Sequence, residues 1–102
     1  MNIQQKSALE RLIAVAKRDT GQCRRVANFL LSWWNTPACG AWEVTDVWSL
    51  DRQITVDILV VLALIAQEHS YPDSLGYEAD FQQILHQWRP QFFAELTDGD
   101  LS

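Results

Sequence analysis

The sequence has few of the residues that mark specialised protein classes. It contains two cysteines, three prolines, four glycines and two histidines among 102 residues. Cys23 and Cys39 form no Cys-x-x-Cys motif, and no cysteines and histidines stand at the spacing of a zinc site. We therefore expect no metal and no cofactor, and both thiols are predicted to stay reduced.

Long hydrophobic runs are also missing. The longest apolar stretch, residues 58–66, is less than half of the roughly 20 residues that a membrane-spanning helix needs. Residues 1–12 are polar and carry both charges, which is not the pattern of a secretory signal. These two features predict a cytoplasmic protein that does not enter a membrane.

What is present fits one globular domain. The length is that of a single domain, 1–102, and 48% of the residues are hydrophobic. Five tryptophans supply large rigid side chains for a small core. Only the polar, acidic residues 97–102 are expected to fray as a tail.

Charge is distributed unevenly along the chain. Residues 1–25 hold six basic and two acidic side chains, whereas residues 26–102 hold two basic and eleven acidic ones. The net charges of the two parts are +4 and −9, which together give −5. Such asymmetry indicates either a charged face for a partner or internal neutralisation of the basic part by the acidic part. We favour internal neutralisation.

Hydrophobic periodicity predicts helices over 5–18 and 21–35. The first has an apolar stripe at helical spacing, and the second is capped by Thr20 and ends at Thr36–Pro37, because a residue before proline avoids α geometry. The stripe residues are Leu9, Leu12, Ile13 and Ala16 in the first helix, and Val26, Leu30, Trp33 and Trp34 in the second.

The second half of the chain continues in helices. A connection over 36–50 contains one short helical turn, capped by Thr45 or Asp46. Residues 52–68 follow with Asp51 as their cap. Because this helix is apolar nearly all round, we predict it in the middle of the bundle. A further helix is predicted over 78–89, and Pro90 either kinks it or starts a last short helix over 90–96. The fold class is therefore an all-α bundle of four main helices plus short pieces.

Asp57 is the one carboxylate next to the long apolar run. If it is buried it requires a partner, and Arg24 or Arg25 is our preferred prediction. Exposure of Asp57 in the second turn of its helix is the alternative.

Candidate chemistry is sparse. Cys39 and His69, with Asp46, Asp51 or Asp57, offer the groups of a thiol nucleophile, but nothing in their spacing pairs them. We expect no catalytic residue and no enzyme activity. A basic cluster around the first turn resembles the layout of a helix-turn-helix. However, the acidic pI of about 4.7 argues against nucleic-acid binding.

Residues 33–48, "WWNTPACGAWEVTDVW", hold four of the five tryptophans. We predict that Trp42 and Trp48 close the open end of the bundle, with ligand contact as the alternative. Aromatic and arginine side chains are favoured at interface centres. The candidate interaction residues are Arg18, Arg24, Arg25, Trp42, Asp46, Trp48 and Tyr71.

Three segments carry a family resemblance: "DTGQCRRVANFLLSWWN", "TDVW" and "HSYPDSLGY". They resemble a family of small uncharacterised bacterial proteins encoded on plasmids, integrative elements and phage-related islands. The resemblance spans about residues 8–90 and implies no activity and no catalytic residue. It implies an accessory protein of a mobile element, a class that often binds host or rival proteins, including defence systems.

Three functions are consistent with the sequence. The first is a small non-enzymatic accessory protein that binds an unknown protein partner, with a homodimer as one form. The second is an inhibitor of a host defence or nucleic-acid enzyme, in the manner of an anti-CRISPR, whose acidic surface mimics nucleic acid. The third is a small enzyme or ligand-binding protein with a pocket formed by Trp42, Trp48 and Tyr71.

Overall fold

The computed structural model describes residues 1–91 and shows helices and no strand in that part of the chain. This confirms the predicted all-α class. Residues 90–91 are helical, and the rest of the helix predicted over 90–96, like the predicted tail, lies outside the described residues. The elements are α1 (Ile3–Ala16), α2 (Gly21–Cys39), the 3-10 helix η1 (Val44–Ser49), α3 (Arg52–Glu68), the 3-10 helix η2 (Pro72–Leu75) and α4 (Glu78–Trp88).

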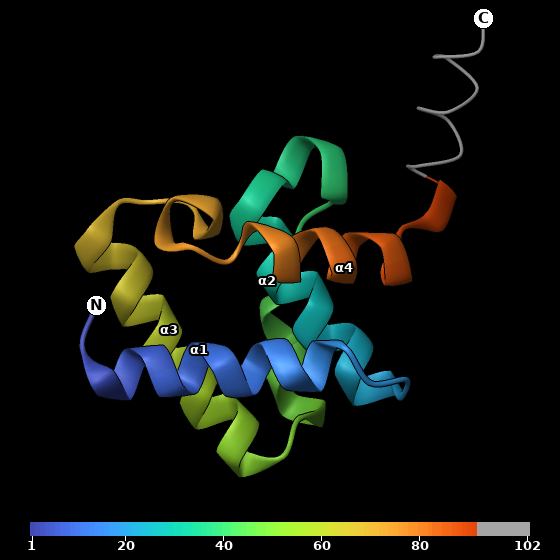
Figure 1. Cartoon of the computed structure of the whole chain (residues 1–102). Helices are drawn as coiled ribbons and strands as arrows, with labels where there is room; N and C mark the ends of the chain where they lie inside the picture. Colours follow the sequence, from blue (N-terminus) through green and yellow to red (C-terminus); the bar gives the residue numbers. More distant parts are fainter. Residues whose placement is uncertain (92–102) are drawn as a thin grey trace, which may run out of the picture.

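Helix α1 is the central element of the bundle. It contacts α2, α3 and α4, and in Figure 1 it crosses in front of α3 and of the lower part of α2. At its start, Asn2 and Gln5 form a capping box, because the Asn2 side chain accepts the Gln5 N–H at 2.7 Å and the Gln5 side chain accepts the Asn2 N–H at 3.0 Å. The predicted apolar stripe of α1 is buried.

Helix α2 begins as predicted and carries one further turn after a break. The Thr20 hydroxyl accepts the Cys23 N–H at 3.3 Å and caps the helix. The helix breaks at Asn35, where the backbone becomes extended, and a further turn runs to Cys39. The Asn35 side chain accepts the Ala38 N–H at 3.3 Å. Pro37 lies in the first turn of this added piece, where a missing N–H costs nothing. The break at Asn35 therefore agrees with the predicted span 21–35, and the added turn up to Cys39 was not predicted.

Helix α3 does not occupy the predicted middle of the bundle. One face, with Ile54, Ile58, Val61 and Leu64, is buried and packs on α1. The opposite face is open to solvent, and Leu59 on that face is 60% exposed. The physical reason is that α1 already lies between α3 and α4, so one side of α3 has no helix against it.

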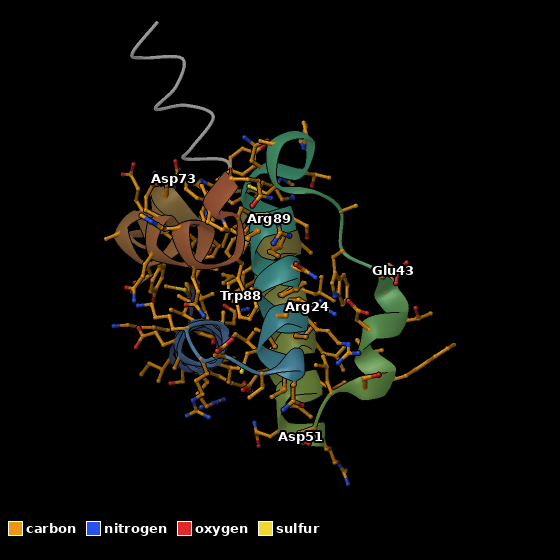
Figure 2. The ribbon with its side chains drawn as sticks, turned by 90° about the vertical axis from the view of Figure 1, so that its right-hand side faces the viewer. Arg24, Glu43, Asp51, Asp73, Trp88 and Arg89 are labelled. Atoms are coloured by element: carbon orange, nitrogen blue, oxygen red, sulfur yellow. The ribbon has the colours of Figure 1, made fainter. Side chains whose placement is uncertain are left out.

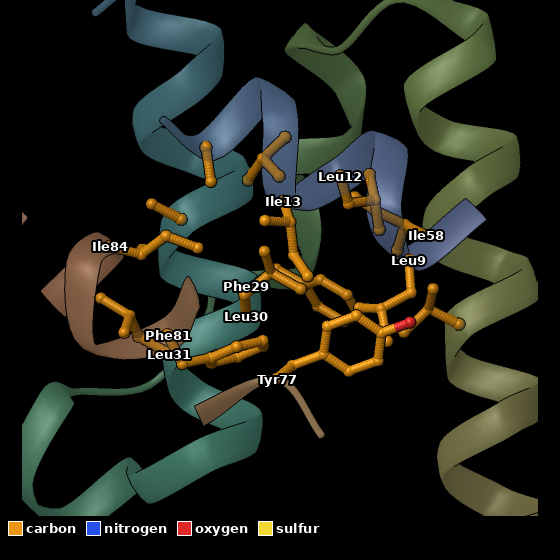
Figure 3. Packing of buried hydrophobic residues seen from close by; sticks show 14 of the residues in the cluster. Leu9, Leu12, Ile13, Phe29, Leu30, Leu31, Ile58, Tyr77, Phe81 and Ile84 are labelled. Carbon is orange, nitrogen blue, oxygen red and sulfur yellow. The ribbon is translucent and has the colours of Figure 1, made fainter. Parts of the chain in front are cut away.

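The core gathers apolar side chains from all four α-helices and from Tyr77 (Figure 3). Trp33 and Trp34 both pack edge-on against Phe81 of α4, with ring centroids 6.0 and 5.9 Å away. The Trp33 indole N–H also donates to the Ser70 carbonyl at 3.1 Å. Trp33 and Trp34 thus fasten α4 and the segment before η2 to α2.

Asp57 is buried, and its partner is Arg11. The Arg11 guanidinium donates Nε to Oδ2 at 3.0 Å and Nη2 to Oδ1 at 2.8 Å, and Gln53 donates to Oδ1 at 3.1 Å. The predicted partner, Arg24 or Arg25, was wrong because α3 packs on α1 and so meets the bases of α1. Such a two-pronged pair satisfies a carboxylate in a low-dielectric site.

Candidate interaction surface

Five of the seven candidate residues lie on one side of α2, around the segment that joins it to α3. We call this surface the connector face and define it by Arg24, Arg25, Trp42, Asp46 and Trp48. Figure 2 shows η1 standing beside α2, with Arg24 on the α2 side. Between the two lies an open hollow of about 440 Å³, lined by Arg24, Arg25, Asn28, Ala41, Glu43 and Asp46.

Trp42 anchors the first part of this segment to α2. Its ring is half-buried and meets Phe29 edge-on, with centroids 4.9 Å apart and an interplanar angle of 66°. This agrees with the prediction that Trp42 closes the bundle. The indole Nε1 is buried and has no hydrogen-bond acceptor within residues 1–91. The packing of the ring, rather than its polar atom, therefore holds Trp42 in place.

Two polar links hold the rest of the segment. Arg25 Nε lies 3.8 Å from Asp46 Oδ1, a loose ion pair between α2 and η1. At the start of α3, the Gln22 side chain accepts the Asp51 N–H and donates to Asp51 Oδ2 at 3.2 Å. Asp51 thus occupies the predicted cap position, but its side chain bonds Gln22 and not the helix N–H groups. The connector is pinned near both of its ends.

The Trp48 side chain, on η1 within this segment, points into solvent and away from α2. It is 83% exposed, so the prediction that it closes the core was wrong. The reason is the three-residue period of a 3-10 helix, which places Trp48 on the same side as exposed Thr45, whereas Val47 and Leu50 are half-buried. Neither predicted cap, Thr45 nor Asp46, starts η1, because its N-cap is Glu43 and makes no side-chain bond.

The other two candidates lie elsewhere. Tyr71 is 61% exposed and lines a hollow with α2 residues that flank the break at Asn35. Arg18 is exposed in the turn between α1 and α2, where its carbonyl accepts the Gln87 side-chain N–H at 2.8 Å. The structure therefore places Trp42, Trp48 and Tyr71 in three different settings, with Trp42 packed, Trp48 outward and Tyr71 beside the later part of α2.

The basic first quarter is partly neutralised within the molecule. Three of its six bases pair with later acids: Arg11 with Asp57, Lys17 with Asp80 at 2.6 Å, and Arg25 with Asp46. This is the internal neutralisation favoured from the charge distribution. Arg24 remains an exposed cation beside the hollow.

Most of the chain matches a known protein family. The model of a family of unknown function, DUF7673, matches residues 6–89. The chain belongs to this family. No curated protein and no solved structure matches the chain. Membership of the DUF7673 family agrees with the resemblance to an uncharacterised family and brings no catalytic residue with it.

Chemistry at the cysteines is limited by their surroundings. Both thiols are free and buried. Burial raises the pKa of Cys39, and Arg89 lowers it by a smaller amount. A raised pKa keeps Cys39 as a neutral thiol, which is a weak nucleophile.

Within residues 1–91, no group of three His, Cys, Asp or Glu could hold a metal ion. No helix there is long and apolar enough to span a membrane.

Sequence reasoning missed one surface entirely. The outward face of α3 carries a row of exposed apolar residues that includes Val56 and Leu59. The sequence held a sign of this surface, because residues 58–66 are apolar on every side of the helix. If a neighbouring helix covers only one side, the apolar residues on the other side stay exposed. The apolar row on α3 is separate from the connector face, where Trp48 and Arg24 are exposed.

Proposed function

We propose that this protein acts by binding another protein through the connector face, as a small non-enzymatic accessory factor. The observation that carries the proposal is Trp48, the most exposed aromatic side chain within residues 1–91, on a segment that is pinned by Trp42 and Asp51. An indole held in water by a fixed support loses little conformational entropy when a partner covers it. Tryptophan and arginine are the residues most often found to dominate binding energy.

The family resemblance supports the setting of this proposal. We propose that the protein is an accessory protein of a mobile genetic element that works in the cytoplasm of a bacterial host, where it would meet host or rival proteins. We favour protein binding over mimicry of nucleic acid because four carboxylates already lie in internal ion pairs: Asp46, Asp57, Glu68 and Asp80. Paired carboxylates present less negative charge to a basic groove.

Affinity capture from the native host tests the proposal. The tagged full-length protein, Trp48→Ala and Gln82→Ala are compared, since Gln82 is an exposed position on α4. Because Trp48 is exposed, its replacement leaves the fold intact, which circular dichroism verifies. We expect a specific partner to be retained by the wild type and by Gln82→Ala, and lost with Trp48→Ala. Truncation of a central interface tryptophan costs about 2 kcal/mol, or roughly thirty-fold in Kd.

Arg24→Glu provides a second arm of the same experiment. Arg24 is exposed beside the hollow, so reversing its charge is expected to slow association and weaken capture at low salt more than at high salt. Recovery of the same partner at equal yield by wild type, Trp48→Ala and Arg24→Glu would refute the proposal, as would the absence of any specific partner.

A further inference from the structure

The outward face of α3 forms an unpartnered apolar seam. Its residues are spaced by four, three, four and three positions, which is the spacing of a helix-pairing seam. All of them are exposed, on the side of the helix opposite to the buried row that packs on α1. We call this seam the α3 outer face, and it consists of Arg52, Val56, Leu59, Ala63 and Ala66.

Single exposed apolar residues are ordinary, but a continuous row along one rigid helix is not. Leu59 is 60% exposed and Val56 43% exposed, and Leu62 lies exposed beside them. The only charged member of the row is Arg52 at its first position. A seam of this composition is the kind that a second helix covers.

We propose that a second copy of the chain covers this seam, with the two α3 helices antiparallel across a two-fold axis that crosses the seam between Leu59 and Ala63. The order of large and small side chains along the seam supports a second copy of the chain as the partner. In the antiparallel arrangement Leu59 lies opposite the partner's Ala63, and Val56 lies opposite the partner's Ala66. Each large side chain thus meets a small one, which allows close packing of two helices. The two-fold axis makes every such contact occur twice.

Charge selects the same arrangement. Arg52 stands at the N-terminal end of the seam, so antiparallel pairing places it level with the C-terminal end of the partner's α3. That end carries the negative pole of the helix dipole. Parallel pairing would instead set the two Arg52 guanidinium groups side by side, and like charges at an interface are unfavourable.

The inference goes beyond the proposed function, because it uses neither Trp48 nor Arg24, and either can fail without the other. A seam of one helix is smaller than a standard protein interface. The dimer is therefore weak and forms at high protein concentration.

Sedimentation equilibrium of the full-length protein over a wide concentration range tests the dimer. The average mass of the wild type is expected to rise from 11.7 kDa toward twice that value. Leu59→Arg, at an exposed position that tolerates substitution, is expected to raise the dimer Kd at least ten-fold. Gln82→Arg adds the same charge on α4 and is expected to dimerise like the wild type. A wild type that stays monomeric, or a Leu59→Arg variant that dimerises normally, would overturn the inference.

Engineered cysteines test the direction of the helices. Val56→Cys and Ala66→Cys are oxidised separately and as a mixture, with the native thiols protected by their burial. Antiparallel pairing is expected to give the disulfide-linked dimer in the mixture, while each variant alone stays largely monomeric. Linked dimers in each separate sample and none between the two variants would show parallel pairing and contradict the arrangement.

Discussion

Asp57 is the residue whose environment matters most to the stability of the fold. It is almost fully buried between α3 and α1, and three hydrogen bonds from Arg11 and Gln53 satisfy its two oxygens. Arg11, by contrast, is half exposed. Removing the arginine would leave a buried carboxylate with only one donor, which is costly, whereas removing both partners leaves no unpaired charge.

Arg11→Met is therefore expected to lower the urea midpoint of unfolding clearly. The methionine side chain keeps the aliphatic packing of the arginine but leaves the buried Asp57 carboxylate without its charged partner. Adding Asp57→Leu to the same chain is expected to recover most of the loss, since an apolar side chain of similar size then fills the site. Urea unfolding followed by circular dichroism measures both effects.

Lys6→Met is the matched control, because Lys6 is exposed on the same helix. It is expected to shift the midpoint several-fold less than Arg11→Met. If the Arg11→Met and Lys6→Met variants unfolded at the same urea concentration, the pair with Asp57 would have no role in stability.

At the scale of residues, the sequence pointed to the side chains that matter, Asp57, Trp42 and Trp48. It did not predict the partner of Asp57 or the exposure of Trp48 correctly. It marked Asp57 as the carboxylate that needs a partner, but the choice among the six bases of residues 1–25 depends on which helices touch. It marked Trp42 and Trp48 together, although only Trp42 packs. The local helix type separated them, since the 3-10 period of η1 places Trp48 outward.

At the scale of elements, apolar periodicity predicted the four main helices because each needs a buried stripe, as Leu9 and Leu12 show in α1. Composition could not tell which faces of α3 would be covered. The length and the apolar run of α3 are compatible with a position in the middle of the bundle. They are equally compatible with a position at its edge, where one apolar face is exposed. The difference depends on the long-range packing of α1 between α3 and α4.

The break in α2 is an element-scale feature that a capping residue supports. Asn35→Ala removes the acceptor for the Ala38 N–H and is expected to lower the free energy of unfolding by about 1 kcal/mol. Asn35→Asp keeps a side-chain acceptor at the same place and is expected to retain most of the stability. Urea unfolding compares the three proteins, and equal losses for Asn35→Ala and Asn35→Asp would show that Asn35 does not act as a cap.

At the scale of the whole molecule, two surfaces project from a core centred on α1. The connector face lies on α2 and η1, and the α3 outer face lies on the side of α3 away from α1. Apart from Trp42, which packs on Phe29, their residues lie outside the main core, so each surface can bind a partner without disturbing the fold. The charge distribution agrees, because internal pairs neutralise half of the basic first quarter and leave Arg24 at the surface.

The central claim is that Trp48 lies at the centre of a contact with another protein. Photo-crosslinking from position 48 in cells of the native host tests this most directly. A photoreactive phenylalanine analogue is placed at position 48 and, as a control, at exposed position 82. We predict one covalent product of defined mass that forms from position 48 and not from position 82. The same products from both positions, or none from position 48, would contradict the account.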